Sequence, residues 1–498
     1  MLPVEAYRLL DLPSPRPPRL GLDRWHHAAV GWFRRWRGPP LADRVAAVQA
    51  VAQGYGAFSE EALRYALQPW VVELRRHPGL AVVDGACAVL LEMARRALGC
   101  PCSAEVVRAV LAMDGGWLVE LPSCQERTVA AVLAALLVAW RGRSCHLLTG
   151  SDVSSEQHWA AASRLGSWTG QRVGLVQTRL EAGARQQQYA CDVICVTVRQ
   201  LAEDFLRDRH QVGVGRVAER NRLRWLIRPA TSPTDLFLRG LASAVVADAD
   251  RVMLDEALVP GHWRIPQGDV ALPAPEREER IAIPSLLGGY RRLAGIAARI
   301  GGDAGEYWSL YGLPVVAAGR RPVCPTPRTY LFATMEEKWQ AVVDAIDRLR
   351  GTETRIVLVV RHVGSARALA DLLRAQGIIG AGDGDHAGVA IVLSAEAEMA
   401  CVEGVAVWMV EMLESPRREE GLWCASGVAT CRYISLDEKS VQNHWPALLA
   451  QILRNHVSKG GRSLDRLSMV ALDWVRHRAR RADRRRRLIV HTLNTLWE

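Results

Sequence analysis

The pattern of apolar and polar positions changes in character along the 498-residue chain. Residues 41–113 repeat apolar positions at helical spacing, in stretches such as LADRVAAVQAVA and ACAVLLEMARRAL. This period predicts amphipathic helices. After Trp117, short apolar runs rich in β-branched residues alternate with helical stretches, and the runs read HLLTG, DVICVTV and SAVVADAD. Such alternation predicts a parallel sheet of the α/β class.

A second α/β unit is predicted to begin near Tyr330. Its expected strands include RIVLVV, VAIVLS, VAVWMVEM and CRYISL, and its expected helices are MEEKWQAVVDAIDRLR and SARALADLLRAQG. Before it, residues 259–285 are rich in proline and charge and are interpreted as a connector. The stretch GGYRRLAGIAARI is predicted to be helical, and the chain from about Leu464 to its end is predicted to form one long helix.

The composition says little about the fold but indicates which partners and which cellular compartment to expect. The net charge of +10 favours acidic partners such as anionic lipid or nucleic acid. The eleven cysteines are scattered and contain no CxxC pair, which favours reduced structural thiols in a cytosolic protein. The longest apolar run, VAAVLAALLVAW, is too short to cross a bilayer. We therefore expect a cytoplasmic protein without a transmembrane segment, peripheral at the inner face of the membrane.

One stretch, VELPSCQERT at residues 119–128, has the outline of a phosphate-binding loop: a strand, a turn, Arg127-Thr128 and then an apolar helix. Such loops need glycines, because only then can backbone N–H groups approach phosphate oxygens. Here the turn carries Cys124 and Glu126, and an arginine stands where lysine is needed. Two interpretations follow: a functional nucleotide-binding site, or a degenerate site that is kept for its packing. The second is favoured.

From about residue 41 the sequence resembles the SecA preprotein translocase ATPase family. The resemblance rests on several stretches that keep the family's order and near-constant spacing: SEEALRYAL, CAVLLEMARRALGC, YACDVICVTVRQLAEDFLRDR, AVVADADRVMLDEALVP and CRYISLDEK. It implies an α/β fold with two tandem RecA-like, P-loop NTPase-type lobes built on parallel sheets. A helical region is expected at the N-terminus and a long helix at the C-terminus.

The resemblance also implies a division of the chain. The chain is expected to begin with a Pro/Arg-rich arm at 1–40 and a first lobe with N-terminal helices at 41–265. A short connector at 266–283 stands in place of the preprotein-binding domain, and residues 284–320 return to the first lobe and form a linker. A second lobe at 321–462 and the start of a scaffold-type helix at 463–498 follow.

The departures from the family fall on its chemistry. The resemblance aligns each functional position of the family with a residue of this chain. Val106 stands where the family has its adenine-reading Gln, Cys124 and Glu126 stand where it has the glycines of the phosphate loop, and Arg127 stands where it has the phosphate-binding Lys. Thr128 keeps the hydroxyl that would ligate Mg²⁺. The Mg²⁺-side Asp is Ala247, the water-activating Glu is Asp248, and an Arg of the second lobe is Glu398. We therefore predict neither a catalytic residue nor a metal ligand, and we expect that ATP and Mg²⁺ do not bind. Asp248, Asp250, Asp255 and Glu256 could hold a metal, but carboxylates that are solvated or paired with arginine are favoured.

These readings favour a SecA-like pseudo-ATPase, a non-catalytic scaffold or regulator of protein export. Its expected partner is an active SecA-type motor or the export channel. Two alternatives stay open: a divergent but active SecA-type translocase, and a helicase-like RNA-binding protein. The basic run Arg484, Arg485, Arg486 and Arg487 is a candidate site for anionic lipid or RNA phosphate, with a solvated helix face as the simpler interpretation.

Overall fold

The computed structural model describes two units of the chain, one within residues 1–320 and one within residues 321–487. The described residues are 29–30, 32–33, 41–77, 79–141, 144–212, 236–238, 240–264, 278–300, 303–319, 327–349, 355–378, 389–393, 405–413, 419, 422–423, 430–438, 447–458 and 463. The predicted long C-terminal helix lies outside them.

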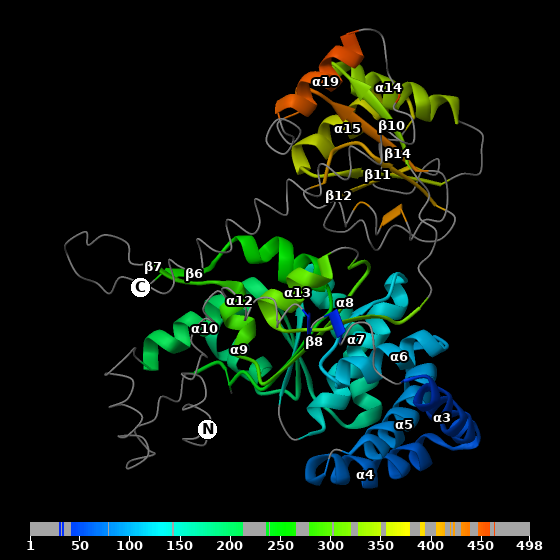
Figure 1. Cartoon of the computed structure of the whole chain (residues 1–498), viewed down its shortest axis with the longest axis vertical. Helices are drawn as coiled ribbons and strands as arrows, with labels where there is room; N and C mark the ends of the chain where they lie inside the picture. Colours follow the sequence, from blue (N-terminus) through cyan, green and yellow to red (C-terminus); the bar gives the residue numbers. More distant parts are fainter. Residues whose placement is uncertain are drawn as a thin grey trace, which may run out of the picture. The chain divides into compact units, whose positions relative to one another are not determined.

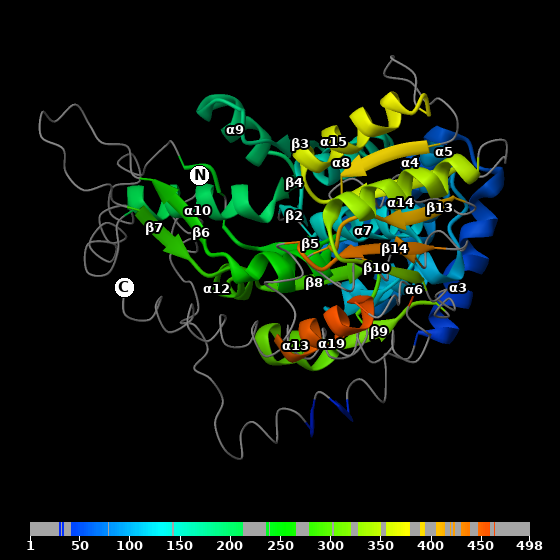
Figure 2. The same cartoon turned by 90° about the horizontal axis from the view of Figure 1, so that it is seen from above.

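Unit 1 is built on a seven-stranded sheet in which every pair of neighbouring strands is parallel (Figures 1 and 2). The strand order is β3-β4-β2-β5-β8-β1-β9. The strands are β1 Leu118–Glu120, β2 Cys145–Thr149, β3 Val173–Val176, β4 Val193–Thr197, β5 Ser243–Val246, β8 Arg292–Ala297 and β9 Val315–Ala317. Because the strands are parallel, the loops that follow them all meet at one edge of the sheet.

Helices cover both faces of this sheet, as expected for parallel strands. One face packs against α6 (Ala104–Asp114), α7 (Cys124–Ala139) and α8 (Asp152–Thr169). Outside these lie α3 (Ala42–Gly54), η1 (Tyr55–Ala57), α4 (Glu60–Arg76) and α5 (Leu80–Leu98). The other face is covered by α10 (Val198–Val212), η3 (Arg251–Asp255), η4 (Glu256–Leu258), α12 (Ile283–Gly288) and α13 (Ala304–Tyr311), while α9 (Ala182–Tyr189) packs beside β3.

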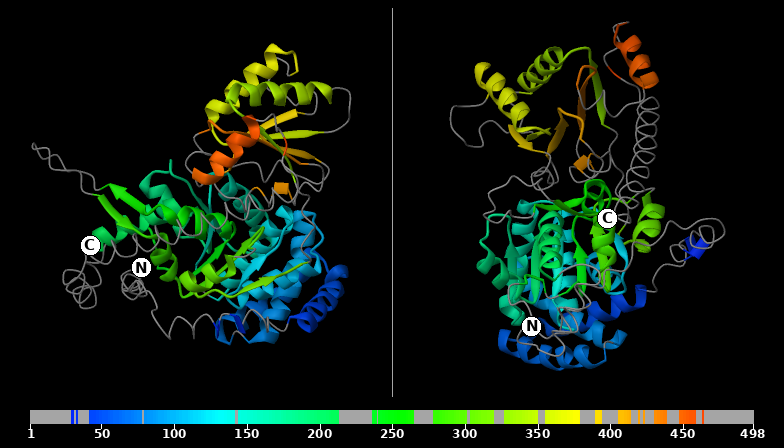
Figure 3. Two further views of the ribbon diagram at one scale, coloured as in Figure 1. Left: turned by 45° about the horizontal axis from the view of Figure 1, so that its top comes forward. Right: turned by 90° about the vertical axis from the view of Figure 1, so that its left-hand side faces the viewer.

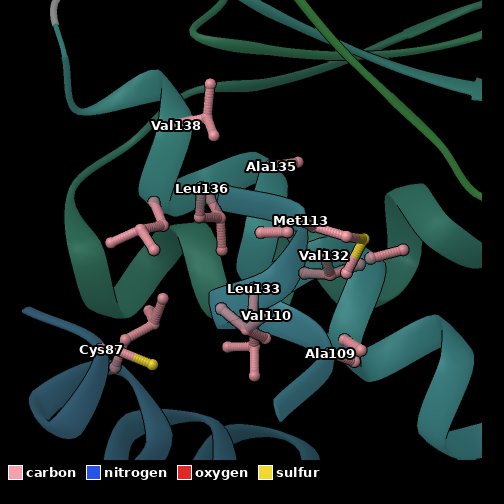
Figure 4. Packing of buried hydrophobic residues seen from close by; sticks show 14 of the residues in the cluster. Cys87, Ala109, Val110, Met113, Val132, Leu133, Ala135, Leu136 and Val138 are labelled. Atoms are coloured by element: carbon pink, nitrogen blue, oxygen red, sulfur yellow. The ribbon is translucent and has the colours of Figure 1, made fainter. Parts of the chain in front are cut away.

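Helix α7 is the centre of the first of these layers. Every residue of 129–139 is buried, so the helix is apolar all round, as a fully enclosed helix must be. Val132, Leu133 and Leu136 of α7 lie among side chains of α5 and α6, including Cys87 and Val110 (Figure 4). The helix that follows the candidate loop is therefore the main packing element of unit 1.

One sequence prediction is wrong. The stretch GGYRRLAGIAARI, expected to be helical, contains strand β8 between β5 and β1. Its Ala, Leu and Ile residues suit a helix, but at this place the segment is buried on both faces of the sheet. Gly295 is needed there because an added Cβ would lie 3.0–3.2 Å from Leu118, Val246 and Ala249. Tertiary packing overrides local propensity.

The ends of the expected connector form a two-stranded antiparallel ribbon of β6 (Gly261–Arg264) and β7 (Glu278–Ile281). The ribbon packs on α10 through Gly261, where an added Cβ would lie 2.4 Å from the Cβ of Ala202.

Unit 2 contains a five-stranded parallel sheet in the order β10-β14-β13-β11-β12. Its described elements are β10 Arg328–Phe332, α14 Met335–Arg348, β11 Ile356–Val360, α15 Val363–Ala375, β12 Val389–Leu393, β13 Ala406–Met409, β14 Cys431–Ser435 and α19 Ala447–Ser458. Alternate residues of β11 point to opposite faces: Ile356 and Leu358 face α14 and α15, and Val357 and Val359 face a second apolar cluster. The predicted α/β class with two parallel sheets is confirmed.

Candidate functional site: the loop between β1 and α7

The candidate loop lies at the carboxyl edge of the unit 1 sheet, between β1 and α7. Helix α7 begins at Cys124, so residues 121–123 alone separate strand from helix. Ser123 is the N-cap residue, and its Oγ accepts the N–H of Glu126 at 3.4 Å. In a phosphate-binding loop the N–H groups of this turn are presented to the ligand. Here the chain's own hydroxyl takes one of them.

Arg127 turns back onto the loop that precedes it. Its side chain is buried, and Nη1 donates to the carbonyl of Pro122 at 2.6 Å and to that of Leu121 at 3.4 Å. Backbone carbonyls carry partial negative charge, so these contacts satisfy a buried cation. The guanidinium therefore holds the loop closed from within.

Thr128 keeps the hydroxyl that a magnesium site would use, but this hydroxyl donates to the carbonyl of Cys124 at 3.2 Å. Such bonds to the residue four positions back are common for threonine within helices. Cys124 and Glu126 lie in the same first turn, both half-buried. The structure thus brings the four predicted loop residues 124 and 126–128 together, in a helical turn that is bonded to itself.

Two further predicted positions supply no polar side-chain atom. Val106 lies in α6, is 1% exposed and faces the apolar core. Ala247 follows β5 and is 2% exposed, and its N–H donates to Leu148 of the neighbouring strand at 2.8 Å. Neither side chain can donate to a base or ligate a metal.

Asp248, the next residue, is the acid that remains beside the loop. Its Oδ2 accepts a hydrogen bond from Ser154 Oγ at 2.8 Å and the N–H of Gly150 at 3.3 Å. Both partners come from the segment after β2, the strand beside β5. The sequence reasoning did not identify these partners. The available signal was Ser151, an N-cap residue directly after a predicted strand, which places the first turn of α8 at the same edge.

The ionisation of Asp248 is set by opposing effects. Burial disfavours the carboxylate, but nearby His158 and the hydrogen bond from Ser154 outweigh it, so the pKa of Asp248 lies below its usual value. The Gly150 N–H and the Arg127 cation act in the same direction. His158 is itself buried and its Nδ1 lies 2.7 Å from the carbonyl of Ser154. The carboxylate is therefore held in an internal network at neutral pH.

Among the neighbouring acids, Glu256 pairs with arginine. Glu256 pairs with Arg251 at 2.8 Å and with Arg199 at 3.5 Å. The arginine-paired interpretation therefore holds for Glu256. Arg251 also crosses Gly150, where an added Cβ would lie 2.4 Å from its Cδ. No group of three potential ligands among His, Cys, Asp and Glu is close enough to hold a metal within the described ranges.

In unit 2, the helix N-termini at the carboxyl edge of the sheet are occupied by protein carboxylates. Glu411, after β13, accepts the N–H groups of Arg361 and His362 at 2.6 and 3.2 Å, at the start of α15. Asp437, after β14, accepts the N–H of Met335 at 3.1 Å, at the start of α14. Helix N-termini of this kind otherwise attract anionic ligands.

Two parts of the predicted site lie outside the described residues: Glu398, and the basic run Arg484, Arg485, Arg486 and Arg487. None of the described helices has both the length and the apolar character that crossing a bilayer requires.

Residues 33–267 match the family described as the SecA DEAD-like domain. These residues form a SecA-family domain. The chain is 30% identical over 260 residues to protein translocase subunit SecA 2 of Magnetococcus marinus, a match that covers 52% of this chain and 36% of the relative. It is 27% identical over 265 residues to SecA 2 of Chlorobium chlorochromatii, covering 52% of this chain and 40% of the relative. The chain thus matches well under half the length of these SecA proteins.

Among solved structures, Dbp5 of S. cerevisiae bound to RNA and ADP BeF3 is 12% identical, with a TM-score of 0.45, and the match covers 73% of this chain and 90% of that one. The strand orders show the parallel-sheet α/β fold, and the sequence match shows the SecA DEAD-like domain.

Proposed function

We propose that this SecA-type chain is a pseudo-ATPase that acts as a non-catalytic scaffold or regulator in protein translocation. The observation that carries the proposal is the position of Arg127, whose guanidinium donates to the Leu121 and Pro122 carbonyls. A cation that contacts the terminal phosphates of ATP would have to leave these partners. A planar guanidinium is also a poor replacement for the compact ammonium of lysine.

The remaining positions support the same proposal. The Thr128 hydroxyl is bonded to the helix backbone, and Ala247 offers no oxygen for Mg²⁺. Glu126 stands in the first turn of α7, where a bound phosphate would sit. Two like charges about 4 Å apart repel by roughly 1–4 kcal/mol at effective dielectric constants between 80 and 20. A bound phosphate would therefore lack the lysine, the Mg²⁺ ion and the loop glycines that normally hold it, and the Glu126 carboxylate would repel it.

Unit 2 argues against the helicase-like alternative. An RNA strand at the carboxyl edge of that sheet would meet Glu411 and Asp437 at the helix N-termini. Carboxylates at these positions repel backbone phosphates, which supply most of the affinity of proteins that bind nucleic acid without sequence preference.

The proposed partners are an active SecA-type motor or the export channel, met at the cytoplasmic face of the membrane. In this proposal the chain keeps the packing of a motor lobe and offers its surface to the partner instead of turning over ATP. The run 484–487 is proposed to strengthen attachment to anionic lipid or to RNA.

Calorimetric titration of the purified chain with Mg-ATP tests the proposal. We expect no binding with a dissociation constant below about 100 µM, which corresponds to roughly −5.5 kcal/mol. A tighter constant would refute the pseudo-ATPase assignment.

A variant with Cys124→Gly, Glu126→Gly, Arg127→Lys and Ala247→Asp provides the matched comparison. If this variant binds Mg-ATP while the parent does not, these four positions are what prevents binding. Circular dichroism of both proteins checks that the fold is unchanged, and an active SecA serves as the positive control for the titration.

A further inference from the structure

We propose that Asp208 of α10 forms a pH-sensitive clasp, which holds residues 236–238 in mild acid and loosens them towards neutral pH. The clasp consists of Asp208, the three residues that it holds and the side chains around them. This inference goes beyond the proposed function and does not depend on whether the chain binds nucleotide. Helix α10 lies on the opposite face of the unit 1 sheet from α3, α4 and α5, which are drawn in blue (Figures 1 and 3).

The held segment is attached through its main chain. Asp208 accepts the N–H groups of Phe237 and Leu238, one on each carboxylate oxygen, at 3.0 and 2.7 Å. The side-chain amide of Gln186, in α9, donates to the carbonyl of Leu236 at 3.3 Å. These contacts fix the chain shortly before it enters β5, an interior strand of the unit 1 sheet.

The Phe237 ring closes the clasp from the side. It stacks on Tyr189 of α9, with the ring centroids 6.2 Å apart. The guanidinium of Arg207 lies 4.0 Å from the Phe237 centroid, a distance typical of a cation–π contact. The cation next to Asp208 in the sequence is therefore directed at the ring.

The Asp208 carboxylate is buried without a counter-ion at hydrogen-bond distance. It is 1% exposed, and within the described ranges no arginine, lysine or histidine forms an ion pair with it. Asp204, one turn earlier on α10, is a second buried acid, and its own cation is Arg185 at 2.7 Å. Burial of a carboxylate beside another acid favours the protonated form. Accordingly, burial raises the pKa of Asp208 to about 7, although the two N–H bonds and Arg207 act in the opposite direction.

The other titratable groups around α10 have partners or stay neutral. His210 lies 2.9 Å from Glu279 of β7. The hydroxyl of Tyr189 donates to Asp204 at 2.8 Å, and burial raises the pKa of Tyr189 well above its ordinary value. Burial also raises the pKa of Asp204, which Arg185 opposes. The remaining elements packed on α10 are α12, which has no titratable side chain, β4, which has the buried thiol of Cys195, and β6, which has the exposed His262.

The sign of the pH effect follows from this burial. While the segment is held, Asp208 keeps its proton up to about pH 7. Once the segment is released, water reaches the carboxyl, whose ordinary pKa is about 3.9. Attachment is therefore strongest below about pH 4 and weakens as the pH rises to 7. Between pH 5 and pH 7 the equilibrium constant for release should rise about fiftyfold, and by pH 8 about twofold more.

Hydrogen–deuterium exchange of the full chain, resolved to single amides by fragmentation, measures the release. The protection factors of the Phe237 and Leu238 amides, corrected for the intrinsic pH dependence of exchange, should fall about fiftyfold from pH 5 to pH 7. The amides of Leu147 and Cys195, in interior strands of the sheet, report unfolding of the whole unit. They should be more strongly protected at each pH.

Three variants separate titration from packing. Asp208→Asn keeps the shape of the side chain but cannot titrate, so its protection factors at pH 5 and pH 7 should agree within about twofold. Glu203→Gln is the matched control, because Glu203 is a half-buried carboxylate on the same helix, and it should keep the full change. Phe237→Leu should lower the protection of Leu238 at both pH values and leave its pH dependence intact, because the ring holds the segment without titrating.

Three results would overturn the proposal. The first is protection of Phe237 and Leu238 that does not change with pH in the parent, and the second is an unchanged pH dependence in Asp208→Asn. The third is exchange of these amides no faster than that of the sheet interior, which would show that the segment is released only when unit 1 unfolds. The first and third results are decided with the parent chain, so the test stands even if Asp208→Asn does not fold.

Discussion

Replacing His146 with glutamine should change how the stability of unit 1 depends on pH. His146 lies on β2 with 2% of its surface exposed, and its Nδ1 is 2.6 Å from the hydroxyl of Tyr290. Burial lowers the pKa of His146 to about 4, from its usual value of 6.5. The folded state therefore keeps this imidazole neutral at pH values where the unfolded chain is protonated.

The sign and the size follow from linkage. Above pH 6.5 neither state binds the proton, and the stabilisation of the folded state is complete. As the pH falls from 6.5 towards 4, the unfolded state gains a proton that the folded state refuses, and stability is lost. A difference of 2.5 pKa units corresponds to a loss of about 3 kcal/mol at pH 4 and below, of which about 2 kcal/mol is lost between pH 7 and pH 5.

Asp208 acts in the opposite sense, and for that reason the comparison must be made with the parent at each pH. Its carboxylate accepts the N–H groups of Phe237 and Leu238 at 3.0 and 2.7 Å, and burial raises its pKa to about 7. Its contribution to stability is complete below about pH 4 and is lost as the pH rises to 7. This contribution cancels in the difference between parent and variant.

Urea unfolding followed by tryptophan fluorescence, at pH 7 and at pH 5, gives the difference in unfolding free energy between parent and His146→Gln. We expect the parent's advantage to shrink by about 2 kcal/mol at the lower pH. Glutamine keeps an amide that can bond to Tyr290, so lost packing affects both pH values equally. A difference that stays the same at pH 5 and pH 7 would show that His146 titrates normally in the folded state.

Two further outcomes are expected, both read from urea unfolding. Lys338→Met should lower the free energy of unfolding by about 3–5 kcal/mol, because the Glu438 carboxylate, 3.2 Å from the buried Lys338 ammonium, would lose that cation. Adding Glu438→Gln should recover most of the loss. A double variant no more stable than the single variant would contradict this. Gly174→Ala should cost about 1–3 kcal/mol, since its Cβ would lie 2.4 Å from the carbonyl of Gln188, whereas Gly183→Ala meets no atom within 4 Å and should be neutral or stabilising; equal effects of the two would refute the argument.

The elements that the sequence predicted well are those whose burial is visible as a local pattern of apolar residues. The runs HLLTG, DVICVTV and RIVLVV became β2, β4 and β11, because β-branched residues pack on both faces of a parallel sheet. Strand β8 has no such pattern in its sequence. Its LAGIA core is equally compatible with a helix, and only its place between β5 and β1 makes it a strand.

The candidate site was predictable to the same extent. The spacing of strand, turn and Arg127-Thr128 identified the loop, because that order is local. The direction of the Arg127 side chain and the partners of Asp248 were not predictable. Ser154 and Gly150 reach Asp248 because β2 and β5 are neighbours, and the order of strands in a sheet is not written in the spacing of the residues.

The burial of α7 on every side limits how the loop before it can change. Deleting the helix would leave α5, α6 and the sheet without their common neighbour, so the segment must persist whatever its loop does. Substitution is then tolerated chiefly at residues 121–128, ahead of the fully buried part. In a genome survey, the apolar pattern of such a helix would identify related proteins. The few residues before it would indicate which of them keep a complete phosphate-binding loop.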